Sequence, residues 1–339
     1  MKKYVRYLLV LLMCGSLTGV KAQKTFQVDG INYYLDGSEA RVSDNRDYSG
    51  SKIIIPNSVL YDGKNYPVTS IADSAFYGNW RLIEVTIPNS VTNIGNYAFH
   101  NCSDLTAITI PNSVTTIGDY AFHNCSGLTT VTIPNAVTNI ENHAFQGCTG
   151  LTTVTIPNSV TEISYDAFDC CTGLTEVIWN ARNAEYYDGT SYDSPFSNCD
   201  RLTDFVFGEE VEYIPDNLCT KLNSLKNTVI DNSVKSIGKW AFHRCTGLIT
   251  VTIPNSVTEI GAWAFYDCSG LTTVTIPNAV TTIEPSAFQD CSSLTTVTIG
   301  EKVESIGEFA FSHCDNLTAV ISKAMTPPEI WEETFEDYA

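Results

Sequence analysis

The sequence predicts an α/β repeat solenoid, a right-handed coil of about a dozen 23-residue units with parallel β-strands and short helical turns. Near-identical runs recur, such as LTTVTIPNAVTNIENHAFQGCTG from Leu128 and LTTVTIPNSVTEISYDAFDCCTG from Leu151. The leucines that open the units are 23 residues apart, except for one step of 28 between Leu174 and Leu202. A unit this short has no core of its own and buries apolar side chains only by stacking on its neighbours. The opening leucines are Leu82, Leu105, Leu128, Leu151, Leu174, Leu202, Leu225, Leu248, Leu271, Leu294 and Leu317.

The first half of a unit predicts a β-strand, as the unit from Leu128 illustrates. Leu128, Val131 and Ile133 alternate with polar residues, which is the pattern of a strand with one buried face. Pro134 and Asn135 follow, and they end the strand because proline has no amide hydrogen to donate and asparagine is favoured in turns. Each unit therefore contributes one strand to a parallel sheet.

The second half of the unit predicts a short second strand and one helical turn. Val137 and Ile140 form the next inward pair, and Ala144, Phe145 and Cys148 lie on one side of a single helical turn. Because these positions recur, we expect ladders of buried phenylalanine and cysteine side chains. The predicted core phenylalanines are Phe99, Phe122, Phe145, Phe168, Phe242, Phe265, Phe288 and Phe311, and the predicted core cysteines are Cys102, Cys125, Cys148, Cys245, Cys268, Cys291 and Cys314.

The cysteine positions favour free, buried thiols over disulfides. Stacked coils place equivalent residues about 4.8 Å apart with parallel Cβ vectors, which is poor geometry for a disulfide. The sequence has no C-x-x-C motif, in which two residues separate the cysteines, and a 23-residue spacing does not match a zinc site. We therefore expect neither a metal ion nor another cofactor.

The chain divides into four predicted segments. Residues 1–22 read as a secretory signal peptide, with a basic start, an apolar stretch and a small-residue cleavage site before Gln23. Lipid attachment at Cys14 is the minor alternative, because Met13 is bulky where a small residue is expected. Residues 23–58 form an N-terminal cap, residues 59–316 the solenoid with an irregular middle at 174–224, and residues 317–339 the start of a C-terminal cap whose completeness stays open.

Charge and motif content restrict the function classes. Removal of residues 1–22 takes away four of the 19 basic residues and none of the 38 acidic ones, so the net charge falls from −19 to −23. Such a surface repels phosphates, which argues against a nucleic acid partner. No other stretch of the sequence is long and apolar enough to predict a transmembrane span. Catalytic motifs such as G-x-S-x-G, H-E-x-x-H and Gly-rich phosphate loops are missing from the sequence, so we predict no enzyme.

The repeated motif L-x-x-V-x-I-P-x-x-V-x-x-I-x-x-x-A-F-x-x-C resembles the BspA-like leucine-rich repeats of bacterial surface proteins. The resemblance extends from about Ile53 to Cys314, and the segments FQVDGINYYLDG and YDGKNYPVTSIADSAF resemble the opening of such proteins. It implies a cell-surface or secreted location and adhesion to host, matrix or cell-surface macromolecules.

Aromatic side chains that point outward form the candidate binding surface. A helical turn that buries Ala144, Phe145 and Cys148 directs the residue before the alanine and the residue after the phenylalanine outward, at about 100° per residue. The alternative is that these rings lie flat and pack coil against coil. The candidate binding residues are Trp240, Trp263, His243, Tyr266, Tyr97 and Tyr120.

The predicted function is that of an exported, non-enzymatic binding protein that presents a repeat surface to a protein or glycan outside the cell. Adhesion is the leading interpretation. The alternatives are a glycan-binding module, in which the aromatic rings stack against sugars, and an inert structural scaffold.

Overall fold

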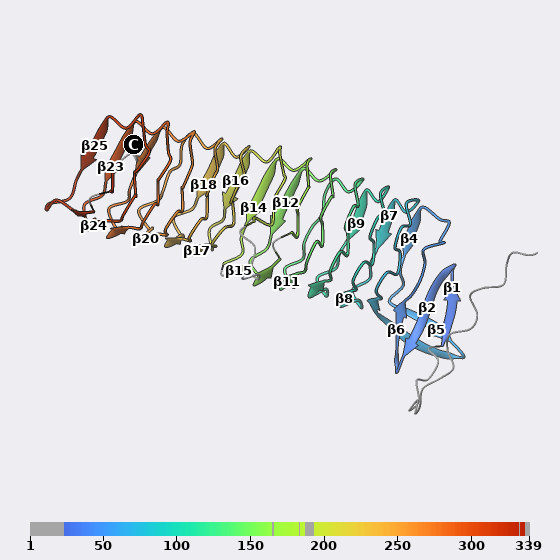
Figure 1. Ribbon diagram of the computed structural model, residues 1–339. Helices are drawn as coiled ribbons and strands as arrows, with labels where there is room; N and C mark the ends of the chain where they lie inside the picture. Colours follow the sequence, from blue (N-terminus) through green and yellow to red (C-terminus); the bar gives the residue numbers. More distant parts are fainter. Residues whose placement is uncertain (1–23, 165, 183, 187–192, 332, 336–339) are drawn as a thin grey trace, which may run out of the picture.

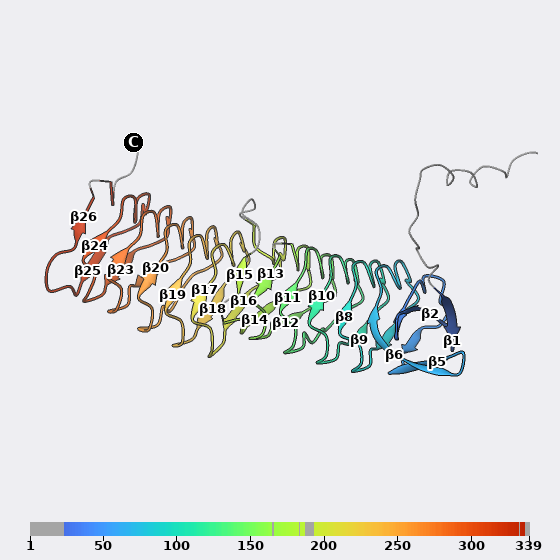
Figure 2. The same ribbon diagram turned by 90° about the horizontal axis from the view of Figure 1, so that it is seen from below.

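The chain forms an elongated stack of coils (Figures 1 and 2). The computed structural model describes residues 24–335 except 165, 183, 187–192 and 332. The predicted signal peptide, with the alternative lipid site at Cys14, therefore lies outside the described residues. The stack is a right-handed parallel solenoid of about 11 turns, so the predicted repeat architecture is confirmed. Every coil has three sides, which are a first sheet, a second sheet and a run of turns.

The first sheet contains the strands that open each unit. It consists of three pieces, with the order β4-β7-β9, β12-β14-β16-β18 and β21-β23-β25. Two coils between these pieces have no strand here and pair with the next coil through a single parallel bridge. The bridges join Thr130 to Thr153 and Thr250 to Thr273. Buried residues alternate with outward ones in these strands, as the sequence predicts. The strands are β4 (Lys52–Ile54), β7 (Glu84–Thr86), β9 (Ala107–Thr109), β12 (Thr153–Ile156), β14 (Glu176–Trp179), β16 (Asp204–Phe207), β18 (Asn227–Ile230), β21 (Thr273–Thr275), β23 (Thr296–Ile299) and β25 (Ala319–Ser322).

The second sheet runs along the opposite long edge of the stack in Figure 1. Its strands also pair in parallel, and the pairing is interrupted between β15 and β17. Most of them have two residues because a corner before them, formed by Pro-Asn in coils such as that of β11, and the turns after them leave little extended chain. The strands are β6 (Lys64–Ile71), β8 (Asn93–Ile94), β10 (Thr116–Ile117), β11 (Asn139–Ile140), β13 (Glu162–Ile163), β15 (Glu185–Tyr186), β17 (Tyr213–Ile214), β19 (Ser236–Ile237), β20 (Glu259–Ile260), β22 (Thr282–Ile283), β24 (Ser305–Ile306) and β26 (Glu329–Ile330).

The third side, called the turn side below, corrects the expectation of short helical turns. No helix occurs in the described part of the chain. Tyr97 and Asn101 have φ angles of 57° and 58°, and such left-handed residues break a helix. Alternate amides point along the stack instead, as when Phe99 N donates to Ala121 O at 2.8 Å, while His100 N donates back to Tyr97 O at 3.2 Å. The turn side is thus a hydrogen-bonded ladder between coils.

Antiparallel strands close the N-terminal end. β1 (Thr25–Val28), β2 (Ile31–Asp36) and β3 (Glu39–Val42) pair antiparallel, and β3 then pairs in parallel with β6 of the second sheet. β5 (Ser58–Tyr61) pairs antiparallel with β6. Tyr33 and Val42 are fully buried beneath these strands, so the apolar end of the stack is covered.

The phenylalanine side chains form two ladders within the core, one on each side of the irregular middle. Phe122 and Phe145 lie face to face with ring centroids 5.1 Å apart, and Phe145 and Phe168 follow at 5.0 Å. All eight phenylalanines expected in the core are at most 1% exposed. Parallel stacking at this spacing follows from the coil repeat, which brings equivalent residues into register.

The cysteine ladder carries hydrogen bonds that the sequence does not reveal. Cys125 Sγ lies 3.1 Å from Phe99 O, and Cys148 Sγ lies 3.1 Å from Phe122 O, so each thiol donates to a carbonyl one coil back. The cysteines expected in the core are buried and free. Each carbonyl also accepts a backbone bond, as from Cys102 N to Phe99 O at 3.1 Å, so the thiol adds a second bond to it while filling space.

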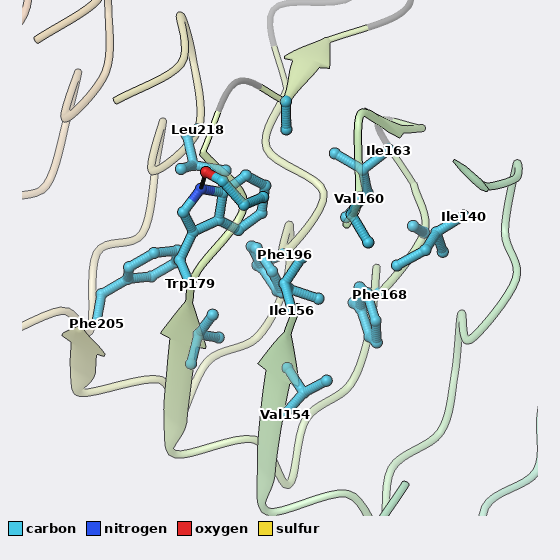
Figure 3. Close-up of a cluster of buried hydrophobic side chains, with 14 of the residues drawn as sticks. Ile140, Val154, Ile156, Val160, Ile163, Phe168, Trp179, Phe196, Phe205 and Leu218 are labelled. Carbon is cyan, nitrogen blue, oxygen red and sulfur yellow. Dashed lines mark hydrogen bonds between the residues drawn. The ribbon is translucent and has the colours of Figure 1, made fainter. Parts of the chain in front are cut away.

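The irregular middle is held together by larger core side chains (Figure 3). Cys219 occupies the phenylalanine position of its coil, which interrupts the ring ladder. Phe205 contacts Phe196 edge to face at 5.6 Å, and Phe207 contacts Phe242 in the same way at 6.1 Å. Trp179 is fully buried beside them, and its Nε1 donates to Ala181 O at 3.1 Å. Rings from β14 and β16 thus fill the volume that Cys219 leaves.

The segment predicted to begin a C-terminal cap adds another turn to the stack. β25 pairs in parallel with β23, and β26 pairs with β24. Phe335 stacks on Phe311 with ring centroids 5.6 Å apart. Ile330, which continues an inward row, is 56% exposed.

Candidate binding surfaces

Two rows of side chains run along the turn side, and their aromatic members are only partly buried whereas small members such as Ser194 and Ser312 are fully buried. The pre-alanine row holds the residue before each Ala-Phe pair or its equivalent, and the post-phenylalanine row holds the residue after it. The pre-alanine row is Ser74, Tyr97, Tyr120, His143, Asp166, Ser194, Asn217, Trp240, Trp263, Ser286 and Phe309. The post-phenylalanine row is Tyr77, His100, His123, Gln146, Asp169, Ser197, Thr220, His243, Tyr266, Gln289 and Ser312.

Trp240 and Trp263 stack on each other in neighbouring coils. Their ring centroids are 5.2 Å apart and the planes differ by 8°. Beside them His243 and Tyr266 stack at 5.1 Å and 16°. All four side chains are half-buried. The two tryptophans cover each other's facing surfaces, and Asn217 and Ser286 hold the equivalent positions in the coils on either side of the pair.

A larger aromatic cluster occupies the first coils. Tyr97 and Tyr120 stack with centroids 4.8 Å apart, and His100 and His123 stack at 4.7 Å. The structure therefore unites the two candidate tyrosines, and it places them far along the stack from the tryptophan pair. Tyr77 extends the post-phenylalanine stack, with its ring 4.6 Å from that of His100.

The ring faces that remain open lie at the start of these stacks. Tyr97 is 37% exposed, because Ser74 precedes it in the row, and Tyr77 is 39% exposed. Trp80 is 56% exposed on the same turn as Tyr77, with Arg81 positioned 4.8 Å from its ring centroid. Sequence reasoning missed Tyr77 and Trp80, although numbering the first coil by its Ala-Phe pair assigns Tyr77 to the post-phenylalanine row.

The fold does not require aromatic residues in the pre-alanine row. Trp240 and Trp263 have φ angles of 55° and 56°, while Ser74 and Ser286 hold the same left-handed conformation at 57° and 56°. Bulky residues adopt this conformation less readily than small polar ones. The backbone conformation of the coil therefore does not explain why these positions carry aromatic side chains.

The histidines of the two clusters are held in their neutral form. Burial lowers the pKa of His243 to about 4, with smaller contributions from Arg244 and Lys221. Burial also lowers the pKa of His100, and for His123 the neighbouring His100 adds to the effect of burial. His100, His123 and His243 are therefore mainly uncharged at neutral pH, in a chain that is strongly acidic overall.

A polar network continues the first cluster toward the irregular middle. Gln146 Nε2 donates to Asp169 Oδ2 at 2.6 Å, and Asn198 Nδ2 donates to Asp169 Oδ1 at 2.8 Å. Asp169 is 8% exposed, so these bonds compensate for burial of its carboxylate. The network fixes the end of the post-phenylalanine stack.

Metal-binding and membrane-spanning features are not found in the described residues. No group of three or more His, Cys, Asp or Glu side chains there is arranged to hold a metal ion. Within the same residues, no helix has the length and apolar character needed to cross a bilayer.

Comparison with known families places the chain. The model of the BspA type leucine rich repeat region, in 6 copies, matches residues 69–194, 128–246 and 212–338. The chain belongs to the BspA-type leucine-rich repeat family. The resemblance found in the repeated motif is thereby confirmed, and the match extends past the solenoid segment expected from the sequence. No curated protein matches this BspA-type chain.

Solved leucine-rich repeat proteins of bacteria are similar to this BspA-type chain. A leucine-rich repeat protein from Bacteroides ovatus is 26% identical, covers 87% of this chain and 94% of its own, and has a TM-score of 0.44. A leucine rich cell surface protein from Faecalibacterium prausnitzii is 26% identical, with 90% and 96% covered and a TM-score of 0.43. The pneumococcal vaccine antigen PcpA is 21% identical, with 91% and 89% covered and a TM-score of 0.46.

Proposed function

We propose that this BspA-type chain is an exported, non-enzymatic binding protein that holds a protein partner on its turn side, as in adhesion to a host or cell-surface macromolecule. Export rests on the predicted signal peptide at residues 1–22. The observation that carries the proposal is the presence of stacked aromatic side chains at positions where other coils place serine in the same backbone conformation.

The geometry favours a protein partner over a glycan at the tryptophan pair. A sugar ring stacks on an open aromatic face, and stacking covers one face of Trp240 and one face of Trp263. Ring edges and polar tips suit a protein surface, where tryptophan and tyrosine are enriched at the residues that dominate affinity. A glycan fits better at Tyr77 and Tyr97, whose faces are open, and this remains the second candidate.

The test is binding to a panel of immobilised extracellular-matrix proteins and polysaccharides. The variants are Trp240→Ser with Trp263→Ser and, separately, Tyr97→Ser with Tyr120→Ser, because serine is the residue that other coils place there. Thr250→Ser with Thr273→Ser on the first sheet is the matched control. We expect binding to at least one protein, weakened about tenfold or more by an aromatic variant and unchanged in the control.

Two results would overturn the proposal. One is the lack of binding to any member of the panel, which favours the inert scaffold. The other is unchanged binding by both aromatic variants with preserved melting temperatures. Binding to polysaccharides alone, lost with Tyr97→Ser and Tyr120→Ser, would replace the protein partner with the glycan.

A further inference from the structure

In the middle of the first sheet, one row of outward-facing positions carries apolar residues in place of the usual threonine. Along this row most coils carry threonine, at Thr86, Thr109, Thr132, Thr155, Thr252, Thr275 and Thr298. Ile178, Val206 and Val229 replace it in three successive strands, and they are aligned in register across β14, β16 and β18. Val229 is 56% exposed, and the other two are half-buried. These three side chains are called the apolar strip.

The apolar strip is a departure that the core does not explain. Its side chains face away from the buried Val177 and Phe205 of the same strands. Threonine serves the same outward position elsewhere, and it is suited to an exposed strand. The other apolar residues in this row, Ile54 and Ile321, lie at the two ends of the sheet. An apolar strip confined to the middle of a sheet is typical of a contact surface.

Carboxylates line the apolar strip on the same face. Glu176 and Asp204 lie two residues before Ile178 and Val206, so they form the adjacent outward row. Asp204 accepts hydrogen bonds from Thr203 Oγ1 at 2.5 Å and Asn227 Nδ2 at 2.8 Å, which lower its pKa and keep it ionised. This row is therefore acidic next to the apolar strip.

A hollow of about 630 Å³ adjoins the strip at the ends of the strands. Thr155, Asn180, Glu209 and Glu210 line part of it, and its lining contains no Lys or Arg. Asn158 Nδ2 donates to Glu210 Oε2 at 3.0 Å across an intervening coil, which fixes one carboxylate at the rim. Glu209 is exposed beside it.

The basic groups near this surface are few and do not neutralise it. Arg182 pairs with Glu212, a further carboxylate, at the corner beyond the strands. Lys226 lies near Asp204 and contributes to its low pKa. Lys235 lies next to Glu212 in the following coil, where its backbone N donates to Glu212 O at 2.8 Å. Against these three cations stand Glu176, Asp204, Glu209, Glu210 and Glu212. The surface therefore combines an apolar strip with a net negative border.

We propose that the apolar strip and its acidic border bind an extended, cationic segment of a protein partner, with an aliphatic side chain over Ile178, Val206 and Val229 and a lysine or arginine two residues away beside the carboxylates. The spacing supports this occupant. Residues two apart along a strand lie on one face, about 6.6 Å from each other, both in this sheet and in an extended ligand. Charge complementarity selects basic over acidic segments.

The surface is separate from the aromatic rows of the turn side, so the two proposals can fail independently. The probe is a synthetic peptide of repeating Val-Ser-Lys-Ser, measured by isothermal titration calorimetry. Two comparison peptides replace valine by serine, or lysine by glutamate. We expect the first peptide to bind at least tenfold more tightly than either comparison peptide.

The variants follow substitutions that the repeat already contains. Changing Ile178, Val206 and Val229 to threonine restores the residue of the other coils, and we expect about a tenfold loss of affinity with folding preserved. Glu209→Gln with Glu210→Gln should weaken binding by a similar factor. Glu301→Gln with Glu304→Gln, which changes the charge equally in a distant coil, is the control and should leave affinity unchanged.

Three outcomes would overturn the proposal. The first is equal affinity for the valine and serine peptides, which leaves only unspecific charge attraction. The second is equal weakening by the two glutamine pairs. The third is full binding by the threonine variant. The Trp240→Ser and Trp263→Ser variant should bind this peptide normally, whatever its effect on the turn side.

Discussion

At the scale of single residues, the cysteine ladder shows how the repeat uses one side chain for two purposes. Cys125 fills a fully buried position and donates its S–H to Phe99 O at 3.1 Å. Burial raises the pKa of the Cys102 thiol to about 12 and that of Cys125 well above its usual range. The thiols therefore stay protonated, unreactive and hydrogen-bonded at physiological pH.

We predict that thiol reagents distinguish one cysteine of the described chain. Cys170 is half-buried and left-handed, with a φ of 58°, whereas the other described cysteines are buried. Labelling of the native protein at pH 8 followed by mass spectrometry should modify Cys170 and leave Cys125 untouched until the protein is unfolded. Comparable labelling rates at Cys125 and Cys170 would contradict the packing of the ladder.

We predict that His243 makes the protein less stable in mild acid. Its pKa is about 4 in the folded state because of burial, against about 6.5 when unfolded. The unfolded state therefore binds more protons between these values, and the free energy of unfolding falls as pH drops from 6.5 toward 4. Replacement by glutamine, the residue of this row at Gln146 and Gln289, should flatten the dependence. The measurement is the melting temperature of both proteins across this range, and parallel curves would refute the role of His243.

At the scale of elements, the sequence predicts the strands well and the turn side poorly. Alternating apolar residues mark the strands of the units, and a proline corner follows the strand in the regular units such as those from Leu128 and Leu151. The spacing of Ala144, Phe145 and Cys148 fits a helical turn equally well, but a left-handed residue such as His143, with a φ of 55°, redirects alternate amides to the next coil. Those bonds form only between stacked coils, so a pattern within one unit does not reveal them.

The irregular middle and the candidate sites also have features that the sequence of a single unit does not predict. The loss of phenylalanine at Cys219 is evident from the repeat, but the compensating rings Phe205 and Phe207 come from another strand. Likewise the sequence places Trp240 and Trp263 in one outward row, yet the covering of one ring by the other depends on side-chain orientation. Contacts between coils decide both features.

We predict that Trp179→Ala is strongly destabilising. The side chain is fully buried in the irregular middle, and its Nε1 donates to Ala181 O at 3.1 Å. Removing it creates a cavity and leaves this carbonyl without its partner, at a cost of about 3–5 kcal/mol. Trp179→Phe keeps most of the volume and should cost clearly less. Denaturant unfolding measures both, and equal losses would show that volume at this position does not matter.

At the scale of the whole molecule, the chain is a rod of coils (Figure 1), and each coil contacts mainly its neighbours. Parallel pairing with a register shift of one unit joins neighbouring coils in both sheets, apart from the interruptions described above. Inward positions are nearly invariant because they form the ladders, while outward positions are free to vary. Departures from the repeat on the outside, such as the apolar strip and the aromatic rows, are therefore where we locate binding.

The central claim is that each coil is stabilised mainly by packing on the neighbouring coils. The most direct test is native-state hydrogen exchange of Phe145→Ala, which removes a ring stacked between Phe122 and Phe168 and should cost about 3–5 kcal/mol locally. We predict that amide protection is lost in the coils around residues 122–168 and retained in the coils beyond Trp240, because interactions are restricted to neighbours. A uniform loss of protection along the whole chain would contradict this account.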